Sequence, residues 1–93
     1  MEPVPYHTYL VECADGTLYA GIALDLAARV RAHNEGKAGA RYTRARRPVV
    51  LRYSEAHPDK GAALRREHEL KRLPRAAKVA LIASFDPEYT GRI

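Results

Sequence analysis

The chain has 93 residues and a formal net charge of +5, from 16 Lys and Arg against 11 Asp and Glu. This length suits one small domain with a modest hydrophobic core and argues against a second domain. No apolar run is long enough to span a membrane, and the first five residues lack the features of a signal peptide, so a soluble, cytoplasmic protein is expected. The single cysteine, Cys13, excludes an internal disulfide and a site with several thiolate ligands.

The positive charge is unevenly distributed along the chain. Residues 1–36 carry five acidic and two basic side chains, and the remainder carries a surplus of eight positive charges. Two basic segments brought together by folding would attract a phosphate backbone, and arginine pairs well with phosphate oxygens. An ordinary solvated surface explains the composition equally well. The basic residues concerned are Arg41, Arg44, Arg46, Arg47, Arg52, Arg65, Arg66, Lys71, Arg72, Arg75 and Lys78.

Residues 6–13 and 17–22 predict a β-hairpin, because both are rich in Tyr, Val, Thr and Leu and an Asp-Gly pair lies between them. With a three-residue loop at residues 14–16, odd-numbered positions face odd-numbered positions, and Tyr9 and Tyr19 share one face of the sheet. A two-residue loop would place the two rings on opposite faces. A joint role for the tyrosines therefore requires the three-residue loop.

Residues 24–34 predict a helix with Asp25 near its start and a Glu-Gly pair after its end. Arg29 and His33 are four residues apart, so they lie on one face of this helix. The following stretch, residues 37–47, combines small residues with many arginines and predicts a mobile loop able to close on a ligand.

Residues 49–54 predict a third strand. Two further helices are predicted at residues 58–73 and 75–84, separated by a proline that ends the first and starts the second. The order β-β-α-β-α-α indicates an α+β fold in which a short three-stranded antiparallel sheet is flanked by helices. The expected domain covers residues 6–84, with residues 85–93 as a C-terminal tail.

Tyr9, Tyr19 and Arg29 follow one another at intervals of ten residues, and Glu67 lies in a later predicted helix. This layout resembles that of a GIY-YIG nuclease domain over about residues 6–83, and most of all the small stand-alone bacterial members of that family. The segments that carry the resemblance are residues 19–22, which begin with Tyr-Ala-Gly, residues 26–30 around the arginine, and residues 63–67 and 70–71 around the glutamate.

The chain departs from the family pattern in three places. The first signature tripeptide appears as His7, Thr8 and Tyr9, where only the tyrosine is kept. His33 stands where several relatives have another tyrosine. A late asparagine found in some repair nucleases is missing, since Asn34 is the only asparagine.

The resemblance implies a metal-dependent endonuclease that hydrolyses phosphodiester bonds in DNA. Glu67 would hold a single Mg²⁺ or Mn²⁺ ion, weakly until the substrate completes the coordination shell. Arg29 would stabilise charge on the phosphoryl oxygens. Tyr9 would be the general base, its pKa lowered by Arg29 and the metal, with Tyr19 positioning water or phosphate; these two roles are interchangeable. His33 would hydrogen-bond the phosphate or relay a proton.

Basic residues near the site are expected to bind the nucleic acid. Low sequence specificity with structure-dependent cutting is expected, because larger relatives gain target choice from appended DNA-binding regions that this sequence does not show. DNA is the expected substrate and RNA the alternative, and the oligomeric state is open. The nucleic-acid-binding candidates are Lys37, Arg41, Arg44, Arg46, Arg47, Arg66 and Lys71.

Each candidate residue also fits an ordinary structural role. Taken singly, tyrosines are common in strands, and a helical arginine or glutamate is most often solvated or ion-paired. A noncatalytic nucleic-acid-binding module on the same scaffold is the main alternative function, and an adaptor presenting an apolar patch on residues 75–84 is another. The nuclease hypothesis requires that Tyr9, Tyr19, Arg29 and Glu67 meet in one concave patch, on the same side of the sheet.

Overall fold

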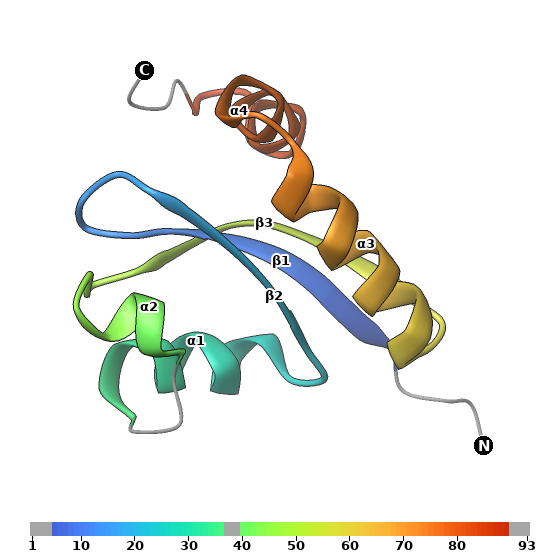
Figure 1. Cartoon of the computed structure of the whole chain (residues 1–93), viewed down its shortest axis with the longest axis horizontal. Coiled ribbons are helices and arrows are strands. Elements are labelled where there is room, and N and C mark those ends of the chain that lie inside the picture. Colours follow the sequence, from blue (N-terminus) through green and yellow to red (C-terminus); the bar gives the residue numbers. More distant parts are fainter. Residues whose placement is uncertain (1–4, 37–39, 90–93) are drawn as a thin grey trace.

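The computed structural model of the chain describes residues 5–36 and 40–89. A three-stranded antiparallel sheet with strand order β2-β1-β3 carries helices on both faces (Figure 1). This confirms the predicted α+β fold, with one short helix in addition to the expected elements. The elements are β1 (Tyr6–Glu12), β2 (Leu18–Ala23), α1 (Leu26–Glu35), α2 (Arg41–Arg44), β3 (Val50–His57), α3 (Lys60–Arg72) and α4 (Arg75–Phe85).

The hairpin between β1 and β2 has the three-residue loop that a shared tyrosine face requires. A backbone hydrogen bond of 2.8 Å from Cys13 N to Thr17 O closes the loop, and Gly16 adopts a φ of 85°, a region that favours glycine. The register pairs odd-numbered residues of β1 with odd-numbered residues of β2. Tyr9 and Tyr19 therefore lie on the same face, as predicted.

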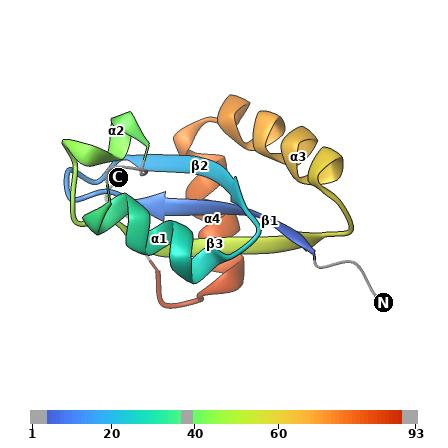
Figure 2. The same cartoon turned by 90° about the horizontal axis from the view of Figure 1, so that it is seen from below.

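Each face of the sheet has its own hydrophobic core. On one face, Tyr9 packs in a cluster with Val30 of α1. On the other face, Leu10 packs with Leu70 of α3 and Ile82 of α4. In Figure 2 α1 lies in front of the sheet and α4 behind it. Because successive residues of a strand point to opposite faces, β1 contributes to both cores.

Aspartate side chains start the two helices that carry candidate site residues. Asp25 accepts a hydrogen bond of 3.0 Å from Ala28 N at the start of α1, and Asp59 accepts one of 2.8 Å from Ala62 N at the start of α3. Such caps satisfy backbone donors that have no partner inside the helix. The predicted helices began one or two residues too early because they included these capping residues.

The predicted mobile loop at residues 37–47 is partly helical. Its described part forms α2, in which Thr43 N donates to Ala40 O at 3.1 Å and Arg46 N to Thr43 O at 2.9 Å. Residues 37–39 lie outside the described residues. One helical turn has no apolar periodicity that the sequence could reveal.

The segment after α4 contacts the sheet. The hydroxyl of Tyr89 donates to Glu12 Oε2 at 3.1 Å, and its ring packs against the core that contains Leu10. Two elements extend beyond their predicted ends: β3 continues to His57 and α4 to Phe85. None of the helices in the described ranges has the length and hydrophobicity needed to cross a membrane.

Candidate active site

Tyr9 lies fully buried in β1 with its hydroxyl against His33 of α1. The distance between Tyr9 Oη and His33 Nε2 is 2.7 Å, and the two rings meet edge to face. The phenol passes over Gly21 on β2, where an added Cβ would come closer to the phenol oxygen than the 3.0 Å that real Cβ atoms respect. Close approach of the tyrosine ring therefore requires the glycine of the Tyr-Ala-Gly segment.

His33 joins Tyr9 to Thr43 of α2. The distance from His33 Nδ1 to Thr43 Oγ1 is 2.8 Å, and Thr43 Oγ1 is 2.8 Å from the Ala40 carbonyl oxygen. Because a carbonyl only accepts, the Thr43 hydroxyl donates to Ala40 and accepts from His33 Nδ1–H. His33 Nε2 then holds the lone pair that accepts the Tyr9 proton. This tautomer satisfies the three short contacts. The longer contact, in which Ala40 N–H donates to Nδ1 at 3.4 Å, requires the other tautomer, in which Nδ1 accepts.

The buried histidine is neutral at pH 7. Burial, followed by the charges of Arg29 and Arg47, lowers the pKa of His33 to about 4. Burial raises the pKa of Tyr9 above its ordinary value of 10, and the hydrogen bond and charge of Arg29 oppose this rise only in part. Arg29 thus acts in the predicted direction, but in the protein alone burial outweighs it. The lowering of the Tyr9 pKa by Arg29 and a metal ion together stays a prediction.

Tyr19 is held in a stack that reaches the surface. Its ring meets that of His33 edge to face at 5.6 Å between centroids and stacks on Tyr42 at 5.7 Å with an interplanar angle of 18°. The guanidinium of Arg46 lies over the Tyr42 ring, 3.9 Å from its centroid, and pairs with Asp15 of the hairpin loop at 3.0 Å. The hairpin and α2 therefore fix the ring of Tyr19 together.

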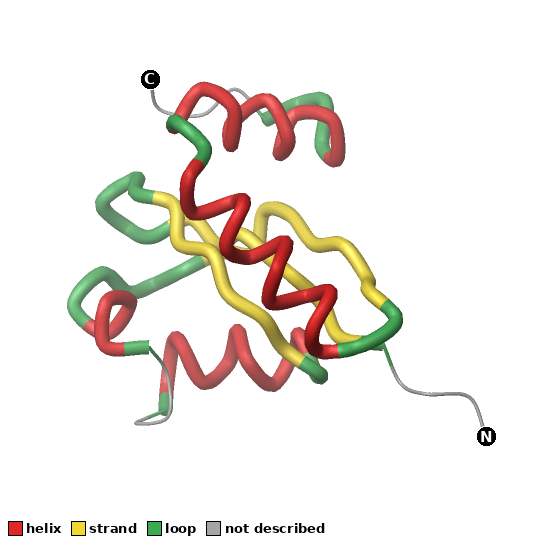
Figure 3. The backbone as a smooth tube through the Cα atoms, turned by 45° about the vertical axis from the view of Figure 1, so that its right-hand side comes forward, coloured by secondary structure: helices red, strands yellow, loops and turns green. Residues whose placement is uncertain are grey.

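Glu67 belongs to α3, which packs on the opposite face of the sheet from α1 (Figure 3). Its side chain is 19% exposed, and Oε2 lies 3.7 Å from Lys71 Nζ, which is too long for a hydrogen bond. The carboxylate lines a surface pocket together with Leu64, Arg65 and His68. It is therefore accessible to a ligand and not locked to its helical neighbour.

The four candidate residues do not all come from one side of the sheet, because Glu67 is carried by the helix on the face opposite Tyr9 and Tyr19. The predicted same-side arrangement, which the nuclease hypothesis required, is therefore wrong, and the hypothesis now depends on interactions between the two faces at the edge of the sheet. The four residues nevertheless act on one atom group: Arg29 hydrogen-bonds Tyr9, and the charges of Tyr19 and Glu67 raise the pKa of its phenol. This is possible because β2 is an edge strand, so side chains from both faces can meet around it.

The donor set at Glu67 fits a hard divalent cation. Within residues 5–36 and 40–89, no three His, Cys, Asp or Glu side chains gather in a cluster that could hold a metal by itself. One carboxylate supplies oxygen, the ligand type that Mg²⁺ and Mn²⁺ favour, and Mg²⁺ usually takes its remaining ligands from water and substrate phosphates. The residues therefore suit an ion that the substrate helps to bind.

Three of the predicted nucleic-acid-binding residues are open to solvent. Arg41 and Arg44 are exposed on α2, and neither side chain forms a hydrogen bond or ion pair with another residue that the structure describes. The Lys71 side chain is 52% exposed beside Glu67. Lys37 lies outside the described residues.

The other three predicted binding residues already have partners inside the protein. Arg46 pairs with an aspartate of the hairpin loop, and Arg66 donates to Glu55 at 2.8 Å. Arg47 donates to carbonyl oxygens at the end of α1, including that of Gly36 at 2.6 Å. It therefore serves as a C-terminal cap for the helix that carries the candidate arginine and histidine.

Sequence reasoning missed Tyr42 and Thr43, which hold Tyr19 and His33 in place. Both lie in the arginine-rich segment that was predicted as a loop. The sequence shows an aromatic and a hydroxyl side chain within that basic segment, but its pattern does not predict that they face Tyr19 and His33.

Comparison with known proteins gives a consistent family assignment. Residues 5–80 match the family model for the GIY-YIG catalytic domain. The chain is 50% identical over 76 residues to a UPF0213 protein of Halobacterium salinarum, a match that covers 82% of this chain and 97% of that protein. It is 49% identical over 77 residues to a UPF0213 protein of Staphylococcus aureus, covering 83% and 93% of the two chains.

Two solved structures resemble the fold. The solution NMR structure of the UPF0213 protein BH0048 from Bacillus halodurans has a TM-score of 0.58 and 38% identity, covering 91% of this chain and 89% of that one. The solution NMR structure of protein EF2693 from E. faecalis has a TM-score of 0.60 and 26% identity, covering 99% and 97%. The chain therefore belongs to the GIY-YIG catalytic domain family, a nuclease superfamily whose members typically use a divalent metal.

Proposed function

We propose that this protein is a metal-dependent endonuclease that hydrolyses phosphodiester bonds in DNA, with low sequence specificity and a preference for structures such as nicks, flaps, branches or single strands. The observation that carries the proposal is the environment of one buried phenol. Tyr9 hydrogen-bonds neutral His33 and Arg29, and it feels the charge of Glu67 from the other side of the sheet. Such a combination of base, cation and carboxylate is suited to hydrolysis of a phosphate ester.

The proton taken from the attacking water passes through Tyr9, whose fully buried phenol must become open to water when the substrate binds. A standing phenolate is unfavourable because burial raises the pKa of Tyr9. The phenol instead gives its own proton to His33 Nε2 as it accepts one from water, because the Nε2 lone pair already faces the hydroxyl. The negative charge of a bound phosphate would offset Arg29 and Arg47, which lower the pKa of His33 in the protein alone.

The remaining groups stabilise charge and hold geometry. Arg29 is placed beside the phenol, so its guanidinium can contact the non-bridging phosphate oxygens. Tyr19, fixed by its stack with Tyr42, positions the water or the phosphate. A divalent ion held by Glu67 would supply positive charge at the phosphoryl group and the leaving oxygen.

The exposed cations supply sequence-independent contacts. Arg41 and Arg44 on α2 have no side-chain partner among the residues that the structure describes, and exposed Lys71 on α3 has only a long ion pair with Glu67, so all three can pair with backbone phosphates. Contacts of this kind fix the position of the backbone without reading bases, which supports low sequence specificity.

A cleavage panel tests the proposal. Single-stranded, duplex, nicked, flapped and branched DNA and single-stranded RNA are incubated with Mg²⁺, Mn²⁺ or a chelator. We expect cleavage of at least one DNA structure that needs the metal, and we expect Glu67→Gln to slow it about 100-fold while DNA affinity changes only a few-fold. Glu35→Gln is the matched control, because this exposed glutamate lies at the end of α1.

A noncatalytic binding module is the other outcome of the same panel. It would bind DNA in a salt-sensitive manner without cutting any substrate in either metal, and Glu67→Gln would leave affinity unchanged. That result would overturn the nuclease proposal. If only RNA is cleaved, the proposed phosphodiester hydrolysis stands and the proposed substrate, DNA, is wrong.

A further inference from the structure

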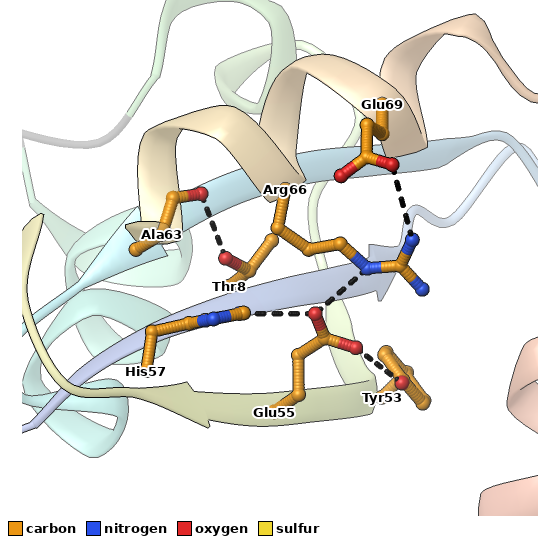
Figure 4. A network of polar contacts seen from close by, with 7 residues as sticks. All are labelled: Thr8, Tyr53, Glu55, His57, Ala63, Arg66 and Glu69. Atoms are coloured by element: carbon orange, nitrogen blue, oxygen red, sulfur yellow. Dashed lines mark hydrogen bonds and ion pairs between the residues drawn. The ribbon is translucent and has the colours of Figure 1, made fainter. Parts of the chain in front are cut away.

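We infer that Thr8, Glu55 and Arg66 form a helix clamp that sets the rotation of α3 and so directs Glu67 to the candidate active site. These three residues hold positions in β1, β3 and α3, and their contacts are shown in Figure 4. The inference rests on the proposed role of Glu67 and adds the residues that position its carboxylate.

The first contact acts on the turn of α3 that carries Glu67. The buried Thr8 hydroxyl donates to the Ala63 carbonyl oxygen at 2.9 Å. In an α-helix the carbonyl of residue 63 also accepts the N–H of residue 67, so the hydroxyl of β1 and the Glu67 amide share one acceptor. Thr8 is fully buried, where an apolar side chain of the same shape would pack equally well, so its hydroxyl contributes the hydrogen bond to Ala63.

The second contact acts on the side of α3 that faces β3. Arg66 Nε donates to Glu55 Oε1 at 2.8 Å. Glu55 also accepts from the Tyr53 hydroxyl at 2.5 Å and lies 3.0 Å from His57 Nε2, so its carboxylate is held from three sides (Figure 4). Thr8 of β1 and Glu55 of β3 are paired residues in the sheet, so the hydrogen bonds to Ala63 and Arg66 both start from the same position along the strands.

Helix geometry turns these contacts into a direction for Glu67. Ala63 and Leu70 are fully buried and mark the line of α3 that faces the sheet. With about 100° between successive residues, Arg66 lies about 60° to one side of Ala63 and Glu67 about 40° to the other. Because Arg66 is held toward β3, Glu67 is turned toward β2, where its charge reaches Tyr9.

Apolar packing alone would define this rotation poorly. At the turn that carries Glu67, the buried apolar residue is Ala63, whose short side chain fixes the rotation of α3 less firmly than Leu70 does two turns later. Two directional hydrogen bonds add to this packing, one at Ala63 on the line that faces the sheet and one at Arg66 on the side away from Glu67.

The test measures the metal requirement of clamp variants. Thr8→Val keeps the shape and removes the hydroxyl, and Thr8→Ser restores it. We expect Thr8→Val to raise the Mn²⁺ concentration for half-maximal cleavage about tenfold, as for other groups that support a metal ligand, with unchanged DNA affinity. Thr8→Ser should return it to within about twofold of the wild type. Arg66→Met should shift it in the same direction as Thr8→Val.

A matched control separates positioning from stability. Ile82→Val removes one methylene from the same core, beneath α4 and away from Glu67. If it lowers the melting temperature as much as Thr8→Val and leaves the Mn²⁺ requirement unchanged, positioning is supported. If both variants change the requirement equally, or if Thr8→Val matches the wild type, the clamp inference is wrong.

A second readout does not depend on cleavage. Mn²⁺ bound near Glu67 broadens the NMR signals of nearby backbone amides, including those of residues 66–68, in the protein bound to single-stranded DNA. We expect this broadening to need about tenfold more Mn²⁺ in Thr8→Val. A wild type that never cleaves overturns the proposed nuclease activity, and equal broadening in both proteins overturns the clamp.

Discussion

The two faces of the sheet hold their polar groups in different ways. On the α1 face, Tyr9, His33 and Thr43 are fully buried and bonded in series, and all are neutral at pH 7. On the α3 face, Glu55 and Arg66 are charged and only partly buried. Neutral buried groups are suited to moving a proton, and charged groups near the surface are suited to fixing a helix. The comparison suggests that chemistry and positioning are divided between the faces.

The largest expected effect is a pH-dependent loss of stability on the α1 face, caused by His33. The pKa of His33 is about 4 in the folded protein and 6.5 for an ordinary histidine, as in the unfolded chain. Between these two pH values the unfolded chain binds a proton at His33 and the folded protein does not. The stability that neutral His33 contributes is therefore complete above pH 6.5 and is lost as pH falls toward 4, by about 3 kcal/mol. Urea unfolding at about pH 8 and pH 4 should show wild type and His33→Gln converging at the lower pH. A constant difference would contradict the buried neutral state.

Gly21→Ala should break the α1 face alone. The new Cβ would overlap the Tyr9 phenol, so the ring must leave His33. We expect a loss of about 2 kcal/mol in the free energy of unfolding and a fall of about 100-fold in single-turnover cleavage. Gly61→Ala is the control, because its Cβ meets only two side-chain atoms, of Asp59 at the N-cap of α3 and of Arg65 within α3, and neither belongs to the α1 face. It should retain full cleavage, and equal losses in both variants would refute the specific role of Gly21.

Glu55→Gln should weaken the α3 face in a more acidic window. Burial alone would raise the pKa of Glu55, but hydrogen bonds from Tyr53 and Arg66 outweigh it and leave the pKa below its ordinary value. The contribution of this carboxylate is thus present above the ordinary carboxyl pKa and lost as pH falls through the lower folded value. We expect Glu55→Gln to cost about 1 kcal/mol at neutral pH, with the difference shrinking only below about pH 4. Urea titrations beside those of His33→Gln test whether the windows differ.

The smallest effect concerns the stack on Tyr19. Tyr42→Ala removes the ring between Tyr19 and Arg46 and should cost about 1 kcal/mol, with a few-fold slower cleavage. Tyr42→Phe keeps the ring and should behave as the wild type in thermal melting and cleavage. A loss in Tyr42→Phe equal to that in Tyr42→Ala would show that the hydroxyl, and not the stack, matters.

Local signals explain what could be predicted from the sequence. The Asp-Gly loop specified the hairpin, and hence the shared face of Tyr9 and Tyr19, because turn chemistry acts over a few residues. The capping aspartates likewise placed α1 and α3. The net pKa shift of Tyr9 was beyond such reasoning, since burial depends on helices distant in the chain.

Longer-range geometry explains what was missed. The side of the sheet from which Glu67 approaches depends on the face that α3 covers. The direction of its side chain depends on the rotation of α3, which we infer is set by contacts to Thr8 and Glu55, 59 and 12 residues away along the chain. The internal role of Arg47 was hidden for the same reason. An arginine that caps a helix and one that binds phosphate have the same sequence signature.

The internal use of Arg46, Arg47 and Arg66 limits how the protein can respond to ionic strength. Each would have to give up a carboxylate or carbonyl partner before it could displace a counterion from a nucleic acid. If only Arg41, Arg44 and Lys71 do so, the slope of log affinity against log salt on duplex DNA is about −3, whereas use of all seven predicted cations would give about −6. A protein with so shallow a slope gains little affinity from dilution of the buffer and releases its substrate readily at ordinary ionic strength.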